Sequence, residues 1–133
     1  AILDVDHFKA INDRHGHDIG DLALRHLAQV LDEVCRKGDL PGRLGGEEFC
    51  LIWDEADAAH AVAAAERCRA QLQARPMAMA GKAIPMTVSV GVAVLDAGDR
   101  TFEGLLRRAD VALYAAKGGG RNRVELAASG ILT

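Results

Sequence analysis

The stretch Arg43-Leu44-Gly45-Gly46-Glu47-Glu48-Phe49 decides how this sequence is interpreted. Two glycines between extended apolar segments indicate a tight β-hairpin turn, because glycine adopts the positive φ angles that two-residue turns need. Without Cβ atoms they also let another group approach the backbone. Glu47 and Glu48 add carboxylates at the same tip, and oxygen ligands suit a hard cation such as Mg²⁺. The stretch therefore predicts a triphosphate site, and the alternative is a surface hairpin with solvated glutamates.

Length and composition suit one soluble domain. The 133 residues are 50% hydrophobic and 26% charged, which is the balance of a folded globular chain. The net charge of −3 lacks a basic footprint, so we expect no nucleic-acid polymer as partner. No apolar run approaches the ~20 residues of a membrane span, so we expect no membrane contact in this segment and a cytoplasmic location. The full-length protein could still carry a membrane anchor elsewhere.

Apolar periodicity predicts an alternation of strands and helices. The predicted strands are 1–6, the hairpin arms 40–44 and 47–53, then 86–95 and 121–126. Helical turns are predicted at 7–14, followed by a loop at 15–20 that contains two glycines. The longer predicted helices are one that ends near Arg36, one capped by Asp54 that ends at Pro76, and one capped by Thr101 that stops at Gly118.

This order of elements predicts an α+β fold with a mainly antiparallel central sheet covered by helices. In the strand at 86–95, Ser89, Gly91 and Ala93 share one face, and such small residues predict a closely packed neighbour. The three cysteines, Cys35, Cys50 and Cys68, lack metal-ligand spacing and are expected to be reduced core thiols.

Charged residues gather at the ends of the predicted strands. Asp4 and Asp6 end the first strand beside the acidic hairpin tip, so carboxylates from two strands should surround one point. That arrangement suits metal-assisted phosphoryl or nucleotidyl transfer. Lys9, Lys117 and Arg121 adjoin predicted turns and are candidate donors to phosphate oxygens, although a single lysine is more often only solvated.

Several motifs, in matching order, resemble the GGDEF domains of bacterial diguanylate cyclases, here with the signature Gly-Gly-Glu-Glu-Phe. They are Asp4 to Asp13, Gly16-His17 with Gly20-Asp21, Arg43 to Phe49, Ala109 to Lys117, and Gly120 to Val124. The resemblance implies a nucleotidyl-cyclase or polymerase-palm-like fold and a GGDEF domain at 1–126, with 127–133 as a C-terminal tail or linker. The family's usual helix and preceding segment have no counterpart here, so the N-terminal part of the domain is expected to be missing.

The resemblance also assigns metal and catalytic roles by position. Asp4 and Glu47 match side-chain metal ligands, and Val5 matches a ligand that uses its backbone carbonyl. The implied cofactor is Mg²⁺, with Mn²⁺ as a further possibility. Glu47 and Glu48 are the acidic pair that contains the general base, and the sequence leaves the choice between them open.

The implied substrate is GTP. Asn12 and Asp21 match guanine-reading positions, which suits an amide that donates and accepts and a carboxylate that accepts from guanine nitrogens. His17 lies close to this pair in the family pattern, where ordering the loop and contacting substrate are both open roles. The phosphate-side positions are matched by Phe8, through its backbone, and by Lys9, Lys117 and Arg121.

The segment Arg36-Lys-Gly-Asp39 matches the family's Arg-x-x-Asp site, at which cyclic di-GMP inhibits its own synthesis. An arginine fork can engage guanine or phosphate, and an aspartate can accept from guanine. Arg67 or Arg69 on the following helix would complete this product-inhibition site. The alternative is an ordinary helix end, with an arginine, a glycine stop and a turn aspartate.

The implied reaction joins two GTP molecules into cyclic di-GMP and releases two pyrophosphates. Because each subunit would hold one GTP, a homodimer is implied, as is an upstream sensor domain that brings two copies together. One alternative is a non-catalytic cyclic di-GMP receptor that uses Arg36 and Asp39. Another is a related cyclase that acts on a different nucleotide.

Overall fold

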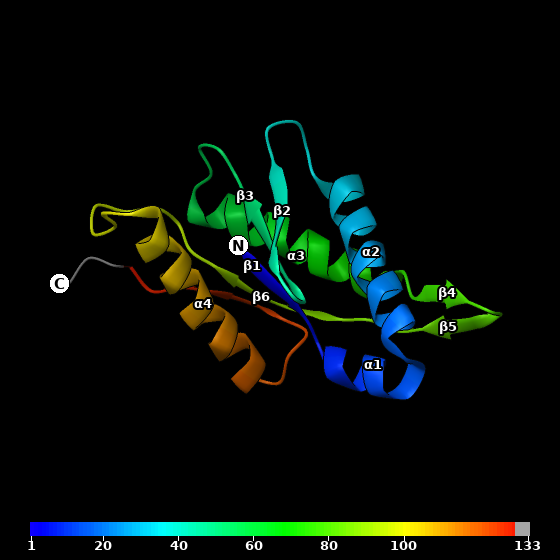
Figure 1. The fold of residues 1–133 in the computed structure, drawn as a ribbon. Helices are drawn as coiled ribbons and strands as arrows, with labels where there is room; N and C mark the ends of the chain where they lie inside the picture. The colour runs from blue at the N-terminus through cyan, green and yellow to red at the C-terminus, as the bar shows by residue number, and fades with distance from the viewer. Residues whose placement is uncertain (130–133) are drawn as a thin grey trace.

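A five-stranded sheet in the order β2-β3-β1-β6-β7 forms the centre of the computed structural model, which describes residues 1–129 (Figure 1). Its strands are β1 (Ile2–Val5), β2 (Leu40–Gly45), β3 (Glu48–Ile52), β6 (Val88–Val92) and β7 (Val124–Leu126). Neighbouring strands are antiparallel except β6 and β7, which run parallel. The predicted α+β class with a mainly antiparallel sheet is confirmed.

Helices cover both faces of the sheet. They are α1 (Phe8–His15), α2 (His17–Val34), α3 (Ala58–Ala74) and α4 (Phe102–Gly118). Successive residues of a strand point to opposite faces, so β1 contributes to two cores. Leu3 and Val5 join the buried residues of α2 and α3, whereas Ile2 packs against α4.

The close approach of α4 to β6 depends on Gly91. A Cβ atom at Gly91 would lie 2.1 Å from the carbonyl oxygen of Ala109 and 2.3 Å from the backbone nitrogen of Leu113. The prediction of a tightly packed neighbour over this small-residue face is therefore confirmed. This contact fixes the path of α4 across the sheet.

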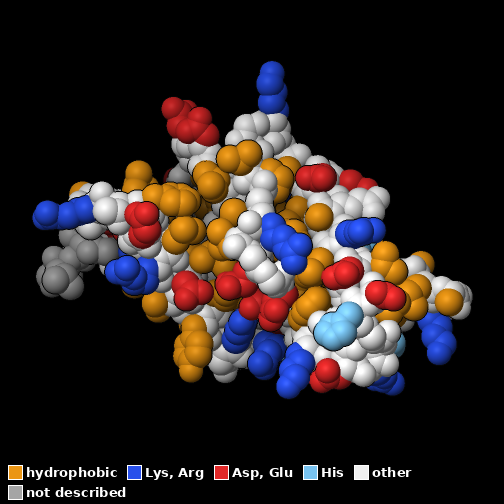
Figure 2. All heavy atoms as spheres, viewed as in Figure 1, with side chains coloured by type: hydrophobic (Ala, Val, Ile, Leu, Met, Phe, Trp, Pro, Cys, Tyr) orange, Lys and Arg blue, Asp and Glu red, His pale blue; other side chains and the backbone are white. Residues whose placement is uncertain are grey.

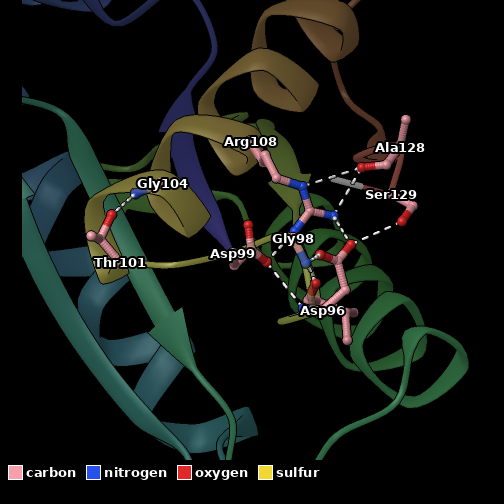
Figure 3. Close-up of polar contacts among 9 residues, drawn as sticks. Asp96, Gly98, Asp99, Thr101, Gly104, Arg108, Ala128 and Ser129 are labelled. Carbon is pink, nitrogen blue, oxygen red and sulfur yellow. Dashed lines mark hydrogen bonds and ion pairs between the residues drawn. The ribbon is translucent and has the colours of Figure 1, made fainter. Parts of the chain in front are cut away.

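The N-terminal half of α4 is anchored by Arg108 (Figure 3). Its guanidinium donates to the Asp99 carboxylate at 2.5 Å and to the carbonyl oxygens of Val94 and Ala128 at 3.0 and 2.8 Å. Thr101 caps the helix as predicted, since its hydroxyl accepts from the backbone nitrogen of Gly104 at 3.0 Å. Arg108 thus joins α4 to the chain that leaves β6 and to the segment after β7.

The structure corrects three local predictions. Residues 15–20 are not a loop, because Gly16 alone separates α1 from α2, with a φ of +92° that ends the first helix. Asp57, not Asp54, caps α3 and accepts from the backbone nitrogen of His60 at 2.8 Å. The connector before β6 contains a small antiparallel sheet of β4 (Met77–Met79) and β5 (Lys82–Ile84), whose arms are too short to show alternation.

The cysteines are free thiols with different environments. Cys68 is buried, and burial raises the pKa of its thiol to about 12. Cys35 and Cys50 are half-buried; Cys35 packs against the edge of the main core, whereas Cys50 is not among the residues of either core, so the prediction of a core position is wrong for Cys50. The predicted C-terminal tail begins at Ala127, whose backbone N–H donates to the carbonyl oxygen of Val92 at 2.7 Å. Residues 130–133 of this tail lie outside the described residues.

We expect Gly91→Ala to lower the free energy of unfolding by roughly 3 kcal/mol, because the added methyl group meets helix backbone that cannot move aside. Urea denaturation monitored by circular dichroism measures the change. Gly118→Ala is the matched control: a Cβ there has nothing within 4 Å, so stability should stay constant or rise by up to about 1 kcal/mol. Equal losses in both variants would contradict the close-packing argument.

Candidate active site

A cavity of about 440 Å³ lies where β1 ends, between α1, the tip of the β2–β3 hairpin and the last turn of α4. Figure 2 shows acidic side chains gathered around the hairpin tip, with Lys and Arg side chains beside them. The cavity is lined by Asp4, Val5, Asp6, His7, Phe8, Lys9, Ala10, Asp13, Glu47, Lys117 and Arg121. Every residue predicted to contact metal or phosphate is therefore in one place.

The hairpin tip holds the two glutamates in different positions. Gly45 pairs with Glu48, so the turn residues are Gly46 and Glu47 instead of the two glycines. Gly46 has a φ of +52°, whereas the φ of Glu47 is negative. A positive φ at the first turn residue only is typical of a type II′ turn. Arg43 stabilises the tip by donating from Nη2 to the carbonyl oxygen of Gly46 at 2.7 Å. Glu47 therefore sits at the tip and Glu48 on strand β3.

Asp4 is a buried carboxylate with a cationic partner. Its side chain is 8% exposed, and Lys117 Nζ donates to its Oδ2 at 2.6 Å from the last turn of α4. Asp4 is also the direct cross-strand partner of Glu48. A buried carboxylate needs such a partner, so Lys117 balances charge that two neighbouring acids concentrate at this point.

The environment of Glu48 raises the pKa of its carboxyl above the usual value. Partial burial is the largest cause, followed by the negative charges of Asp4 and Asp110, while Lys117 acts in the opposite direction. A carboxyl with a raised folded-state pKa binds its proton more tightly in the folded chain. Glu48 therefore disfavours folding increasingly as pH rises from its ordinary pKa through the raised one.

The donor set fits a magnesium ion that binds together with phosphate. Within residues 1–129, no group of three or more His, Cys, Asp or Glu side chains is arranged to hold a metal. Asp4 and Glu47 line the cavity with Val5, and magnesium commonly takes one or two carboxylates and completes its shell with water and substrate phosphates. Burial is the main reason that the pKa of Glu48 is raised, and the negative charges of Asp4 and Asp110 add to it; a cation bound beside Asp4 would offset that charge.

The predicted guanine-reading residues lie on α1 and α2 and do not line the cavity. Asn12 on α1 packs against Gly20 of α2, where a Cβ would lie 1.7 Å from Asn12 Oδ1, and Asp21 is the next residue. Asn12 Oδ1 is buried and has no hydrogen-bond partner in the described chain. His17 is exposed at the start of α2.

The predicted inhibitory residues lie in a turn after α2. The backbone nitrogen of Arg36 donates to Asp39 Oδ2 at 2.8 Å, which holds the two residues together. Arg67 of α3 donates to the carbonyl oxygen of Val34 at 3.4 Å, next to this turn. Arg69 is engaged elsewhere, by Glu66, Gln73 and Asn122, so the geometry favours Arg67 as the third member.

Sequence reasoning assigned no role to three residues that line the cavity, His7, Ala10 and Asp13. Asp13 follows Lys9 by four positions, which places both on one face of α1, and this spacing could have identified it. His7 precedes α1 with a φ of +55°, and no sequence signal for this left-handed conformation was available.

A mainly antiparallel sheet with carboxylates at a strand end and at a hairpin tip defines a nucleotidyl-cyclase, palm-like domain. The family model "Diguanylate cyclase, GGDEF domain" matches residues 1–123, and the chain belongs to this family. The resemblance seen in the sequence is thus confirmed. Within the described residues, no helix is long and apolar enough to cross a membrane.

Relatives and solved structures agree with this assignment. Response regulator PleD of Caulobacter vibrioides is 43% identical over 125 residues, and Diguanylate cyclase A of Treponema denticola is 38% identical over 125. These matches cover 92% and 94% of this chain but only 28% and 34% of the relatives. The active GGEEF domain of a diguanylate cyclase from Vibrio cholerae has a TM-score of 0.88 at 35% identity, covering 96% of this chain and 81% of that one. The GGDEF domain of DgcB from Caulobacter crescentus, in complex with c-di-GMP, has a TM-score of 0.88 at 37% identity, covering 96% and 76%.

Two substitutions should move the pKa of Glu48 in opposite directions. Asp110→Asn removes a negative neighbour and should lower it, whereas Lys117→Met removes the positive one and should raise it. Carboxyl ¹³C NMR titration of the metal-free protein measures both shifts. A pKa that stays unchanged in both variants would show that neither charge acts on Glu48.

Proposed function

We propose that this chain is the catalytic domain of a diguanylate cyclase, which condenses two GTP molecules into cyclic di-GMP and two pyrophosphates. The observation that carries the proposal is the cavity in which Asp4 and Glu47 face Lys9, Lys117 and Arg121. Metal-ligand carboxylates and phosphate-binding cations meet there within a GGDEF domain. The named diguanylate cyclases among the relatives support the same activity.

The residues divide the work at the phosphate end. Asp4, Glu47 and the carbonyl of Val5 would hold Mg²⁺, or Mn²⁺, which supplies charge stabilisation at the reacting phosphate. Lys9, Lys117 and Arg121 neutralise the other phosphate oxygens, and Phe8 contributes its backbone N–H at the start of α1. When phosphate enters, Lys117 can turn from Asp4 towards it.

The residues at the guanine end select the base. Asn12 offers an amide that donates and accepts, and Asp21 accepts from the nitrogen-bound hydrogens on guanine's Watson–Crick edge. His17 lies at the start of the helix that carries Asp21 and is the third member of this group. Adenine presents a different donor and acceptor pattern, so the pair favours GTP over ATP.

The reaction needs two copies of the chain. Each 3′-hydroxyl oxygen attacks the α-phosphorus of the GTP held by the other copy, which breaks the bond to the β-phosphate bridge and releases pyrophosphate. The hydroxyl proton passes to the acidic pair of Glu47 and Glu48. A homodimer is therefore the active species, assembled by a sensor domain in the longer protein. Because its substrate is GTP, the domain is expected to work in the cytoplasm.

Product inhibition would use Arg36, Asp39 and Arg67. The short distance between Arg67 and the end of α2 supports this grouping, as do relatives whose structures contain c-di-GMP. A second candidate function follows from the same turn. Because Arg36 and Asp39 lie outside the cavity, the chain would bind cyclic di-GMP as a receptor even without catalysis.

Incubating the protein with GTP and Mg²⁺ at high protein concentration, where dimers form, should yield cyclic di-GMP, detected by liquid chromatography. Glu47→Gln should lower turnover about 100-fold or more, because the variant loses a metal-binding carboxylate that also belongs to the proton-accepting acidic pair. Arg36→Ala serves as control and should retain turnover at low product concentration. Wild type that forms no product under these conditions would favour the receptor function.

Calorimetry with cyclic di-GMP tests the inhibitory site. Arg36→Ala should weaken binding about tenfold or more, since it removes a guanidinium group that would contact the ligand. Arg69→Ala is a matched control on the same helix as Arg67, and it should bind cyclic di-GMP like wild type. Similar losses in the two variants would argue against the assignment of Arg67.

A further inference from the structure

The carboxylate of Asp6 accepts three hydrogen bonds from other parts of the described chain, whereas that of Asp4 accepts one, from Lys117. Oδ1 of Asp6 accepts from Ser89 Oγ at 2.6 Å, and its Oδ2 accepts from Thr87 Oγ1 at 2.7 Å and from the backbone nitrogen of Asn122 at 3.0 Å. The residue is 6% exposed. Two donors belong to β6 and the strand entry before it, and the third belongs to the loop between α4 and β7. Asp6 therefore bridges the sheet and that loop.

The loop that Asp6 holds has an unfavourable backbone. Arg121 and Asn122 are consecutive non-glycine residues with φ values of +65° and +47°, in the left-handed region that L residues avoid. Such a conformation persists only where surrounding contacts hold it. Arg121 donates its N–H to the carbonyl of Ala116 at 3.0 Å, and Arg69 Nη1 donates to Asn122 Oδ1 at 2.8 Å.

The backbone conformation of this loop sets the direction in which the Arg121 side chain leaves the main chain. Arg121 lines the cavity together with Lys117, three residues after α4 ends. Without the bond from the Asn122 N–H to Asp6, the two left-handed residues could relax. The Arg121 side chain would then no longer be directed towards the cavity. The bond from Asn122 to Asp6 is one link between the buried sheet and this arginine, beside the bond from the Val90 N–H to the carbonyl oxygen of Arg123 at 2.9 Å.

We propose that Asp6 is a positioning residue, which holds Asn122 and thereby directs Arg121 towards the phosphates of the bound nucleotide. The inference rests on the proposed function, in which Arg121 contacts phosphate. It assigns Asp6 the role of anchoring Asn122, because three of the roughly four acceptor positions on its two oxygens are already used within the chain. A purely structural Asp6 would affect stability alone, whereas a positioning Asp6 affects phosphate affinity through Arg121.

The test is a double-mutant cycle between Asp6→Asn and Arg121→Ala. Asparagine keeps the shape of aspartate but replaces the charged carboxylate by one neutral acceptor oxygen, which weakens the bond from the Asn122 N–H. Calorimetry measures the binding of inorganic triphosphate and of GTP, each with Mg²⁺, at a temperature where all variants are folded. Asp6→Asn should weaken triphosphate binding about tenfold in the wild-type background and less than about twofold when Arg121 is already alanine.

Asp99→Asn is the matched control. The Asp99 side chain is also buried, at 3% exposure, and pairs with Arg108 near the start of α4, away from the cavity. This variant should lose stability and keep its triphosphate affinity. Thr87→Val with Ser89→Ala forms a second control, because it removes both hydroxyl donors to Asp6 and leaves the bond to Asn122.

Hydrogen exchange tests the link without any nucleotide. The N–H of Asn122 should exchange slowly in wild type and at least about tenfold faster in Asp6→Asn, with no change in Asp99→Asn. Rapid exchange in wild type would overturn the inference even if Asp6→Asn fails to fold.

The outcomes separate this inference from the proposed function. Wild type that binds neither GTP nor triphosphate overturns the function and, with it, the phosphate role of Asp6, while hydrogen exchange still decides whether Asp6 orders the loop. Unchanged affinity in Asp6→Asn overturns the inference alone. An equal loss with and without Arg121 also overturns it, because Asp6 would then act on the ligand directly.

Discussion

The contact between α4 and β6 is the constraint on which the site depends. With no side chain at Gly91, the helix backbone lies directly on the strand, and its last turn reaches the end of β1. Lys117 can then pair with Asp4, although 113 residues separate them in sequence. A helix held farther from the sheet would leave the Asp4 carboxylate buried without this cation, which is a costly arrangement. Packing on one face thus makes the charge distribution at the sheet end possible.

The larger elements could be predicted because their signals are strong and local. Alternation identified β6, the glycine pair identified the hairpin, and threonine capping identified the start of α4. The errors have physical reasons. Gly20 resembled a loop residue, yet it lies inside α2. A glycine is needed there because a Cβ atom would collide with the Asn12 side chain. Glycine in a sequence therefore indicates either a turn or a close contact, and only the fold distinguishes them.

The sequence predicted which residues line the candidate site better than it predicted how their side chains are hydrogen-bonded. Motif order placed Asp4, Glu47, Lys117 and Arg121 together, and the cavity contains all four. The sequence could not show that Asp6 differs from Asp4, since both are aspartates at the end of one strand. The difference arises from Thr87, Ser89 and the loop at Asn122, which are distant in the chain. Tertiary hydrogen bonds, which no local pattern encodes, decide which carboxylate stays available.

Helix α3 carries two arginines that reach opposite regions of the molecule. Arg67 contacts the end of α2 beside the turn of Arg36 and Asp39, and Arg69, two residues later, contacts Asn122 in the loop next to the cavity. The two arginines are two residues apart, so their side chains leave α3 in nearly opposite directions. The same half-turn of helix therefore contacts both the turn after α2 and the loop next to the cavity.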